Sequence, residues 1–349
     1  MSRTRRRTVA AGVVATVATA SLVSCANVEP PAGSASGNGE IVITYNSPTE
    51  WGNYGEVLRA FTEETGVEAP NDPKNSGQAL AALQAEQGSP VADVAYTGIA
   101  FAEQLVGAGV LQNHVPEGSE DVPEELKDPD GAWTTVHTGA IALIVNEDHL
   151  DGAPVPTSWE DLLDPVYEDK VGYLDPTQAA VGYSAATAVN LALGGSLDDW
   201  GPGLDYLEAL KENGASTSAQ TATAKVAQGE IPILVDTDFN GYKLRDEGTD
   251  VSVVIPEEGS LQIPYIVGLV DGAPHEDNGR RLLDFYFSEQ GQDLFAAGYM
   301  RPVTGEMPAE LADKVLPPED YERAVTIDYV EQGAQQQEFI DLYLDEVGF

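Results

Sequence analysis

Two long β-like runs constrain the fold of this chain. They are WTTVHTGAIALIVN at residues 133–146 and VSVVIPEEGSLQIPYIVGLV at residues 251–270. Before the first run and between the two runs, short apolar strands alternate with amphipathic helices, as in IVITYN (41–46) followed by a helix that stops at Gly66. Strand–helix alternation predicts parallel sheets covered by helices. We therefore expect an α/β fold of two lobes, with the two long runs crossing between them.

The length of 349 residues exceeds one typical core and indicates about two domains. We expect residues 40–140 together with 262–349 to form lobe 1, and residues 141–261 to form an inserted lobe 2. A ligand cleft is expected between them, where strand ends and helix N-termini from both lobes converge.

The first residues have the pattern of an export signal. Four arginines between Arg3 and Arg7 precede a short apolar run, and LVSC follows at residues 22–25. We predict a signal peptide at residues 1–24 and a flexible Pro/Gly/Ser-rich tether at residues 25–39. Cys25 is the only cysteine, so it cannot form an internal disulfide.

The LVSC stretch resembles a bacterial lipobox, which implies cleavage before Cys25 and a lipid on its sulfur. A plain signal peptide with an incidental cysteine is the alternative. Export by the general secretory route or by the twin-arginine route stays open.

The chain is strongly acidic. It carries 58 Asp and Glu against 17 Lys and Arg, a net charge of −41. The acidic residues are dispersed, which favours a solvated acidic surface and disfavours binding to nucleic acid or anionic lipid.

Candidate ligand-binding residues of lobe 1 lie in loops after strands. Hydroxyls just before a helix can hold an anion or cap the helix, and a loop Trp can stack on a ligand or fill the core. His137, isolated in an apolar run, is more readily structural than a proton carrier. The candidates of this lobe and of the first crossing are Ser47, Thr49, Trp51, Thr97 and Thr138.

Lobe 2 offers similar candidates. Tyr183 and Ser184 open a predicted helix, and Gln220 and Thr221 lie in the polar loop STSAQT. Tyr265, in the second crossing, is expected to close over the ligand.

The stretch VDTDFN places Asp236 and Asp238 two residues apart at the end of a buried strand, so alternation predicts that they share a face. They could receive a cationic group of the ligand. Alternatively, one could cap a loop while the other pairs with Lys243 or Arg245. A metal site or an acid–base pair is the third reading, although a metal needs more ligands.

The sequence lacks the spacing motifs of common catalytic sites. It contains no G-x-x-x-x-G-K-[ST], H-E-x-x-H or C-x-x-C pattern. We therefore expect no enzyme, no catalytic residue, no cofactor and no bound metal. A secreted lipoprotein hydrolase is the alternative of another class, and a surface adhesion module is a third.

The motifs SPTEWGNY, ADVAYTG, SWEDLLDPVYEDKVGYLDPT, AQGEIPILVDTDFN and APHEDNGRRLLDFYFSEQGQ, in this order with the two long runs, resemble extracellular solute-binding proteins of ABC importers. The similar branch includes binders of ferric iron, thiamine, sugar phosphates and 2-aminoethylphosphonate. The resemblance implies a type II periplasmic-binding-protein fold that closes on a small polar solute and delivers it to a membrane permease with its ATPase.

A zwitterion such as 2-aminoethylphosphonate would suit the combination of hydroxyl-rich helix starts and carboxylates. Thiamine or a polyamine is the alternative, and ferric iron is another. Iron binders of this branch carry adjacent tyrosines, and the sequence contains no Tyr-Tyr pair. We expect a monomer, anchored by lipid to the outer face of the bacterial cell membrane.

Overall fold

The computed structural model describes residues 40–348. The predicted signal peptide, the lipidation site Cys25 and the tether lie outside the described residues. None of the helices in the described part combines the length and the apolar character needed to span a membrane.

Twelve α-helices and twelve β-strands make up the described chain, together with short 3-10 turns. The helices are α1 Tyr54–Thr65, α2 Ser76–Glu86, α3 Ala102–Ala108, α4 Ala180–Ala192, α5 Gly201–Glu212, α6 Thr223–Ala227, α7 Asp238–Asp246, α8 Glu276–Phe287, α9 Glu289–Ala297, α10 Ala309–Ala312, α11 Pro318–Tyr321 and α12 Tyr329–Glu346. The strands are β1 Thr44–Asn46, β2 Asn71–Pro73, β3 Val94–Gly98, β4 Leu111–Gln112, β5 Thr134–Asn146, β6 Val171–Leu174, β7 Ser216–Ser218, β8 Ile233–Thr237, β9 Val251–Val254, β10 Ser260–Val270, β11 Arg301–Pro302 and β12 Ala324–Val325.

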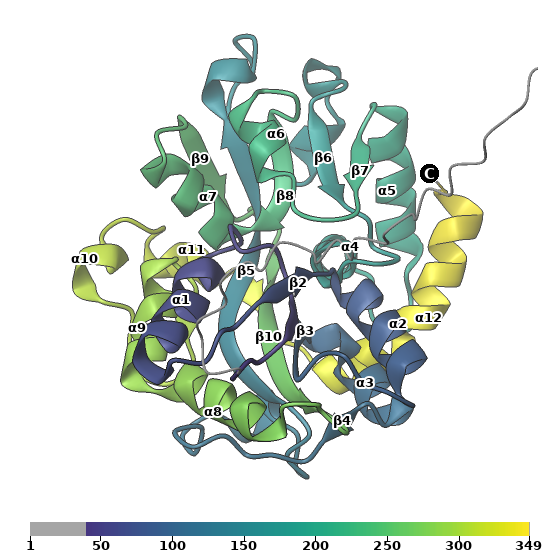
Figure 1. The fold of residues 1–349 in the computed structure, drawn as a ribbon. Helices are drawn as coiled ribbons and strands as arrows, with labels where there is room; N and C mark the ends of the chain where they lie inside the picture. Colours follow the sequence, from purple (N-terminus) through teal and green to yellow (C-terminus); the bar gives the residue numbers. More distant parts are fainter. Residues whose placement is uncertain (1–39, 349) are drawn as a thin grey trace, which may run out of the picture. The chain divides into compact units, whose positions relative to one another are not determined.

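The sheet order confirms the expected α/β fold with two lobes. The main path runs β2-β1-β3-β10-β5-β8-β6-β7. The strands β1, β2 and β3 are parallel on one side, and β6, β7 and β8 are parallel on the other. The long strand β5 pairs with β10 through its first half and with β8 and β9 through its second half, so these antiparallel strands connect the lobes (Figure 1).

The second β-like run is two strands rather than one. β9 ends at Val254, and β10 begins at Ser260. Between them Pro256 accepts the amide of Gly259 in a turn, and Gly259 has a φ of +126°. Only glycine adopts that backbone conformation readily, so the chain reverses there.

The stretch SWEDLLDP at residues 158–165 does not form one continuous helix. Its residues form two short 3-10 turns, Glu160–Leu163 and Pro165–Tyr167. Pro165 disfavours the helical conformation of Asp164, which has an extended ψ of 135°. A continuous α-helix therefore cannot form across this Asp-Pro bond.

The first helix follows the sequence pattern closely. Val57, Leu58 and Phe61 are buried on one face of α1. Gly66 ends the helix in the left-handed conformation with a φ of 75°, and its amide bonds to the carbonyl of Thr62. The loop that connects β1 to this helix therefore starts at the end of β1, beside the pocket described below.

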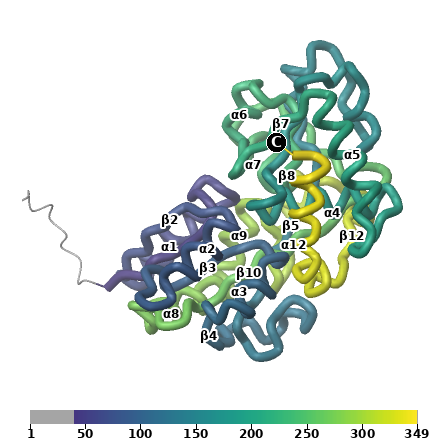
Figure 2. The backbone as a smooth tube through the Cα atoms, turned by 90° about the vertical axis from the view of Figure 1, so that its right-hand side faces the viewer, coloured from purple at the N-terminus to yellow at the C-terminus, as the bar shows by residue number. Residues whose placement is uncertain are grey.

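The C-terminal helix α12 packs against elements of both lobes (Figure 2). Its first half contacts α3, and near its end the hydroxyl of Tyr343 lies 3.0 Å from that of Tyr173 in β6. Phe339 packs against Trp200, which precedes α5. The predicted boundaries place this helix wholly in lobe 1; they stay a prediction.

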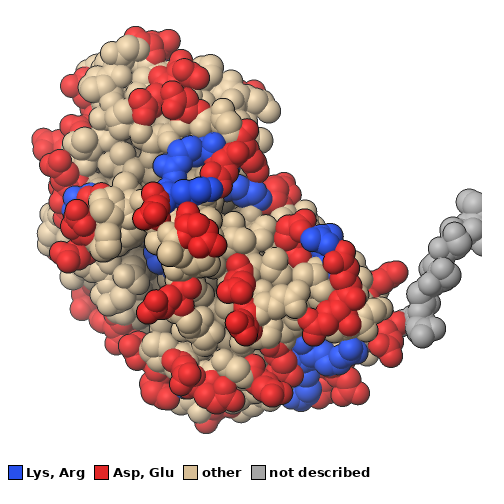
Figure 3. Space-filling model, turned by 90° about the vertical axis from the view of Figure 1, so that its left-hand side faces the viewer, with Lys and Arg blue, Asp and Glu red and all other residues tan. Residues whose placement is uncertain are grey.

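Acidic side chains are spread over the face drawn in Figure 3, with few lysines and arginines among them. This distribution agrees with the dispersed acidic residues of the sequence. It is the surface expected of a protein that does not bind polyanions.

Candidate functional site

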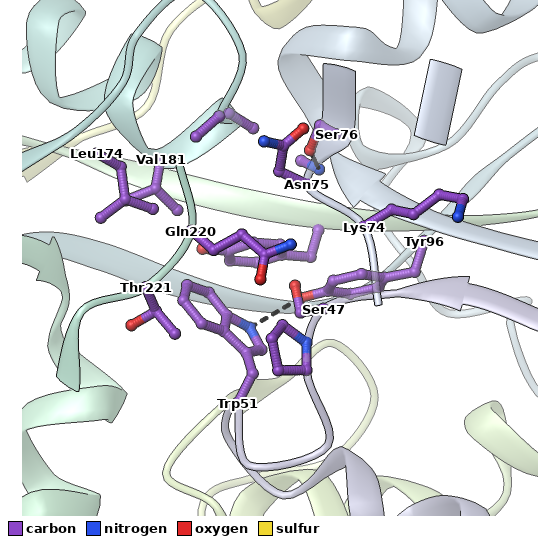
Figure 4. Close-up of a pocket in the computed structure, with 15 residues that line it drawn as sticks. Ser47, Trp51, Lys74, Asn75, Ser76, Tyr96, Leu174, Val181, Gln220 and Thr221 are labelled. Atoms are coloured by element: carbon purple, nitrogen blue, oxygen red, sulfur yellow. Dashed lines mark hydrogen bonds between the residues drawn. The ribbon is translucent and has the colours of Figure 1, made fainter. Parts of the chain in front are cut away.

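A pocket lies between the lobes, where the loop after β1 and the end of β3 face the start of α4 (Figure 4). Its cavity volume, measured as the space open to the centre of a water-sized sphere, is about 40 Å³, so the pocket is narrow in this arrangement of the lobes. The lining residues are Ser47, Pro48, Trp51, Lys74, Asn75, Ser76, Tyr96, Gly98, Leu174, Ala179, Ala180, Val181, Gln220, Thr221 and Tyr265.

Three aromatic rings line this pocket. Tyr96 and Tyr265 stack with ring centroids 5.5 Å apart, and the indole N–H of Trp51 donates to the Tyr96 hydroxyl at 3.3 Å. The register of β10 against β5 shifts between Tyr265 and Ile266, a kind of irregularity that re-aims side chains. The buried hydroxyl of Tyr265 has no hydrogen-bond partner within residues 40–348. A polar ligand atom reaching it would satisfy an unpaired group.

His137 lies behind these rings and is fully buried. Its Nε2 is 3.2 Å from the hydroxyl of Tyr96. Burial lowers the pKa of His137 to about 3, so the imidazole is neutral at physiological pH. The side chain therefore packs with the aromatic rings and does not line the pocket.

Two helices begin at the pocket. Helix α2 is capped by Asn75, whose side chain accepts from the amide of Gln78 while the Gln78 side chain accepts from the amide of Asn75. Helix α4 follows Ala179, which has no side-chain acceptor, and Ala180 and Val181 line the pocket. The first amide groups of a helix have no intrahelical partner, so the start of α4 offers donors to a ligand.

The walls of the pocket touch directly across the cleft. The Asn75 side chain donates to the carbonyl of Ala219 at 2.9 Å, and the amide of Gly77 donates to the carbonyl of Gln178 at 2.9 Å. Elsewhere along the cleft, the ammonium of Lys243 donates to the carbonyl of Gly52 at 2.7 Å. These contacts describe a closed arrangement of the lobes.

Asp238 is held by partners inside the protein. It is fully buried at the first position of α7, where its carboxylate forms an ion pair with Arg301. The carboxylate also accepts from the amide of Ala140 at 2.8 Å and from the hydroxyl of Tyr321 at 2.9 Å. A structural role explains this side chain, and its cation is Arg301 rather than Lys243 or Arg245.

Asp236 is also fully buried, yet it has no ion-pair partner among the described residues 40–348. One carboxylate oxygen accepts from the amide and hydroxyl of Thr237 at 2.7 and 3.2 Å. The other accepts from the hydroxyl of Thr221 at 2.9 Å. Burial raises the pKa of Asp236 to about 6, against these hydrogen bonds, which lower it.

Comparison with known proteins decides the family. A model of the bacterial extracellular solute-binding proteins matches residues 89–332. The chain belongs to this family. It is thus a solute-binding component of an ABC transporter, and the members of its family bind transported solutes.

A curated relative supports the assignment. This solute-binding protein is 32% identical to a Salmonella typhimurium protein named "putative 2-aminoethylphosphonate-binding periplasmic protein". The match extends over 241 residues and covers 67% of this chain and 68% of the relative.

Solved structures confirm the type II periplasmic-binding-protein fold. AfuA from Actinobacillus pleuropneumoniae, with fructose-6-phosphate bound, superposes with a TM-score of 0.77 at 20% identity, covering 88% of this chain and 99% of AfuA. Iron-bound HitA from Pseudomonas aeruginosa superposes with a TM-score of 0.71 at 21% identity, covering 89% and 100%. At such identities the likeness concerns the fold alone.

Four of the predicted ligand-binding residues of this solute-binding protein line the pocket: Ser47, Trp51, Gln220 and Tyr265. Thr221, considered beside Gln220, lines it as well. These residues come from both lobes and from the second crossing strand. Their part in binding stays a prediction.

The structure does not bring the other predicted residues to the pocket lining. Thr97 alternates with Tyr96 and Gly98 along β3, so its side chain points to the opposite face. Thr49 is exposed, and Thr138 is half-buried in β5 opposite Arg301. Asp236 contacts Thr221 of the lining, whereas the partners of Asp238 do not line the pocket.

Tyr183 and Ser184 do not open the helix as predicted, because the helix begins three residues earlier. Helix α4 begins at Ala180, so Tyr183 falls on its buried face. Its hydroxyl donates to the carbonyl of Gln332 at 2.8 Å, and its ring packs against Phe339. The hydroxyl and phenol expected to grip an anion are therefore in or near the core.

Several lining residues have no clear signal in the sequence. Ala180 and Val181 line the pocket at the start of a helix, a position whose backbone amides any residue type except proline could supply. Tyr96 resembles a core strand residue. Only Asn75 is detectable, because its spacing from Gln78 is that of a capping box.

Proposed function

We propose that this solute-binding protein captures a small solute bearing a phosphonate or phosphate group, such as 2-aminoethylphosphonate, and delivers it to an ABC permease. The observation that carries the proposal is the uncapped start of α4, where Ala180 and Val181 line the pocket. Free amides and the helix dipole make a helix N-terminus an anion site.

The other donors of the pocket support an anionic group. Ser76 accepts from the amide of Gly98 at 3.2 Å, so its own hydroxyl hydrogen is available to a ligand. Lys74 lines the pocket, but its ammonium pairs with Asp72 at 2.7 Å and lies over the ring of Tyr45. Neutral donors, rather than a lysine, would then hold the anion.

The alternative ligands fit this lining less well. Ferric iron prefers phenolate and carboxylate oxygens, and a polyamine needs carboxylates along its length. The fifteen lining residues include no Asp or Glu. The name of the Salmonella relative also points to a phosphonate.

A thermal-shift panel tests the proposal. The purified protein would be melted with 2-aminoethylphosphonate, methylphosphonate, fructose-6-phosphate, thiamine, spermidine and ferric citrate. A ligand at 100 times its Kd adds about 2.7 kcal/mol to the free energy of unfolding. We expect a rise in melting temperature with the phosphonate or phosphate compounds.

A rise with spermidine, thiamine or iron alone would refute the proposed ligand class and leave the family assignment intact. Lipid attachment at Cys25 and the monomeric state remain separate predictions. Mass spectrometry of the membrane-bound form and size-exclusion chromatography with light scattering would check them.

A further inference from the structure

The second feature of the pocket is a buried carboxylate behind Thr221. Asp236 has two hydroxyl partners and one amide partner, and it forms no ion pair among residues 40–348. Its neighbour Asp238, by contrast, has Arg301. An ionised carboxylate is costly to bury without a cation, so a cationic group nearby would be favoured.

The hydroxyl of Thr221 connects the Asp236 carboxylate to the pocket. A hydroxyl has one hydrogen and two acceptor lone pairs. The hydrogen of Thr221 is committed to Asp236 at 2.9 Å, so toward a ligand Thr221 can only accept. The neighbouring Gln220 directs its Nε2 toward the side-chain oxygen of Gln78 at 3.4 Å, which leaves its own oxygen as a second acceptor.

The two sides of the pocket therefore differ in polarity. In Figure 4, Asn75, Ser76 and Val181 lie on one side, and Thr221 lies on the other, near the indole of Trp51. The first side supplies hydrogen-bond donors. The second supplies acceptors and an aromatic face, and ammonium groups bind favourably over indole faces.

We propose that Thr221, whose hydroxyl is oriented by Asp236, binds a ligand ammonium group beside Trp51. The ligand would then be a zwitterion, with its phosphonate at the start of α4 and a primary ammonium a few bonds away. This inference rests on the proposed function and adds to it: an aminophosphonate is selected over a phosphonate of the same size without the amine. Asp236 acts here as a positioning residue.

Calorimetric titration with two ligands tests the inference. One is 2-aminoethylphosphonate, and the other is n-propylphosphonate, which has a methyl group in place of the ammonium. A hydrogen bond to a charged group corresponds to a preference of roughly 10- to 100-fold. We expect the wild-type protein to prefer the amine by that factor.

Variants locate the preference. In Thr221→Val and in Asp236→Asn we expect the ratio of the two affinities to fall roughly tenfold or more toward unity. Thr223→Val, two residues along in α6 and outside the lining, is the matched control and should keep the wild-type ratio. The ratio cancels any general loss of binding, and Thr221 lies in a half-buried loop, so its substitution tests the idea even if Asp236→Asn does not fold.

The outcomes separate the two proposals. If the wild-type protein binds both phosphonates equally, ammonium recognition is wrong and the proposed function stands. If it binds neither phosphonate, the inference is wrong, and the proposed function fails as well unless a phosphate compound raises the melting temperature. A wild-type ratio retained in either Thr221→Val or Asp236→Asn would overturn the role given to this pair.

Discussion

We predict that closure of the lobes is sensitive to the size of residue 98, a glycine at the pocket wall. A Cβ added at Gly98 would lie 2.4 Å from the Cβ of Ala180 across the cleft. Gly98 itself has an ordinary extended backbone, with φ −73° and ψ 150°, which alanine adopts without strain. Gly98→Ala should therefore disturb closure while leaving the open lobes intact.

The size of the effect follows from the geometry. Apolar carbons meet at about 3.5–4.0 Å, so the walls would have to separate by about 1 Å. Overpacking of this kind costs about 1–3 kcal/mol. Because only the closed state bears the cost, ligand affinity should weaken by roughly 5- to 150-fold.

Titration calorimetry with 2-aminoethylphosphonate would measure the loss, and small-angle X-ray scattering with and without ligand would follow closure. Ala180→Gly in the Gly98→Ala background removes the opposing methyl group and should restore binding. Gly107→Ala is the control, since no atom lies within 4 Å of its added Cβ. Unchanged affinity in Gly98→Ala, or no recovery in the double variant, would refute closure at this contact.

Three further predictions concern single groups. Asp238→Asn removes the carboxylate that pairs with the half-buried Arg301 and should lower the free energy of unfolding by about 3 kcal/mol, or the melting temperature by about 5 °C. Asp151→Asn, in a pair whose carboxylate is 81% exposed, should change the free energy of unfolding by under about 1 kcal/mol, and equal shifts in the two variants would contradict this. The pKa of Asp236 is raised to about 6 in the folded protein, so as pH rises from about 4 to 6 the carboxyl group ionises in the unfolded chain before it ionises in the folded one, and its contribution to stability falls. The melting temperature of Asp236→Asn minus that of wild type should therefore grow across this window, by the equivalent of about 3 kcal/mol, and a constant difference would contradict the raised pKa. Ala180→Pro removes one amide donor at the first position of α4, where proline is well tolerated because Ala179 is extended. It should weaken phosphonate binding by about tenfold in calorimetry without lowering the melting temperature, and unchanged affinity would show that this amide does not bind the anion.

The architecture was predictable because its signals are periodic. The alternation of strands and helices, and the long run that becomes β5, are patterns of side chains that must be buried on one face or on both. Gly66 ends α1 where expected. The breaks were missed, since Asp164-Pro165 and Gly259 act through backbone conformation, which hydrophobic periodicity does not report.

The pocket was harder to predict because part of its lining is the start of a helix. Ser47 and Trp51 could be found as polar or aromatic residues after a strand. Ala180 and Val181 could not, because the useful atoms are amides whose exposure depends on where α4 begins. A shift of three residues in the helix start moved the prediction onto Tyr183, which is in the core.

The two carboxylates illustrate the limit most clearly. Asp236 and Asp238 are indistinguishable by pattern, yet Asp238 meets Arg301, more than sixty positions away in sequence, through an ion pair at the crossing strands. Only that long-range pairing shows which aspartate is already neutralised. It leaves Asp236, linked to the pocket through Thr221, as the carboxylate with an unmatched charge, and an unmatched buried charge beside a ligand pocket is most simply explained by a ligand that carries the opposite one.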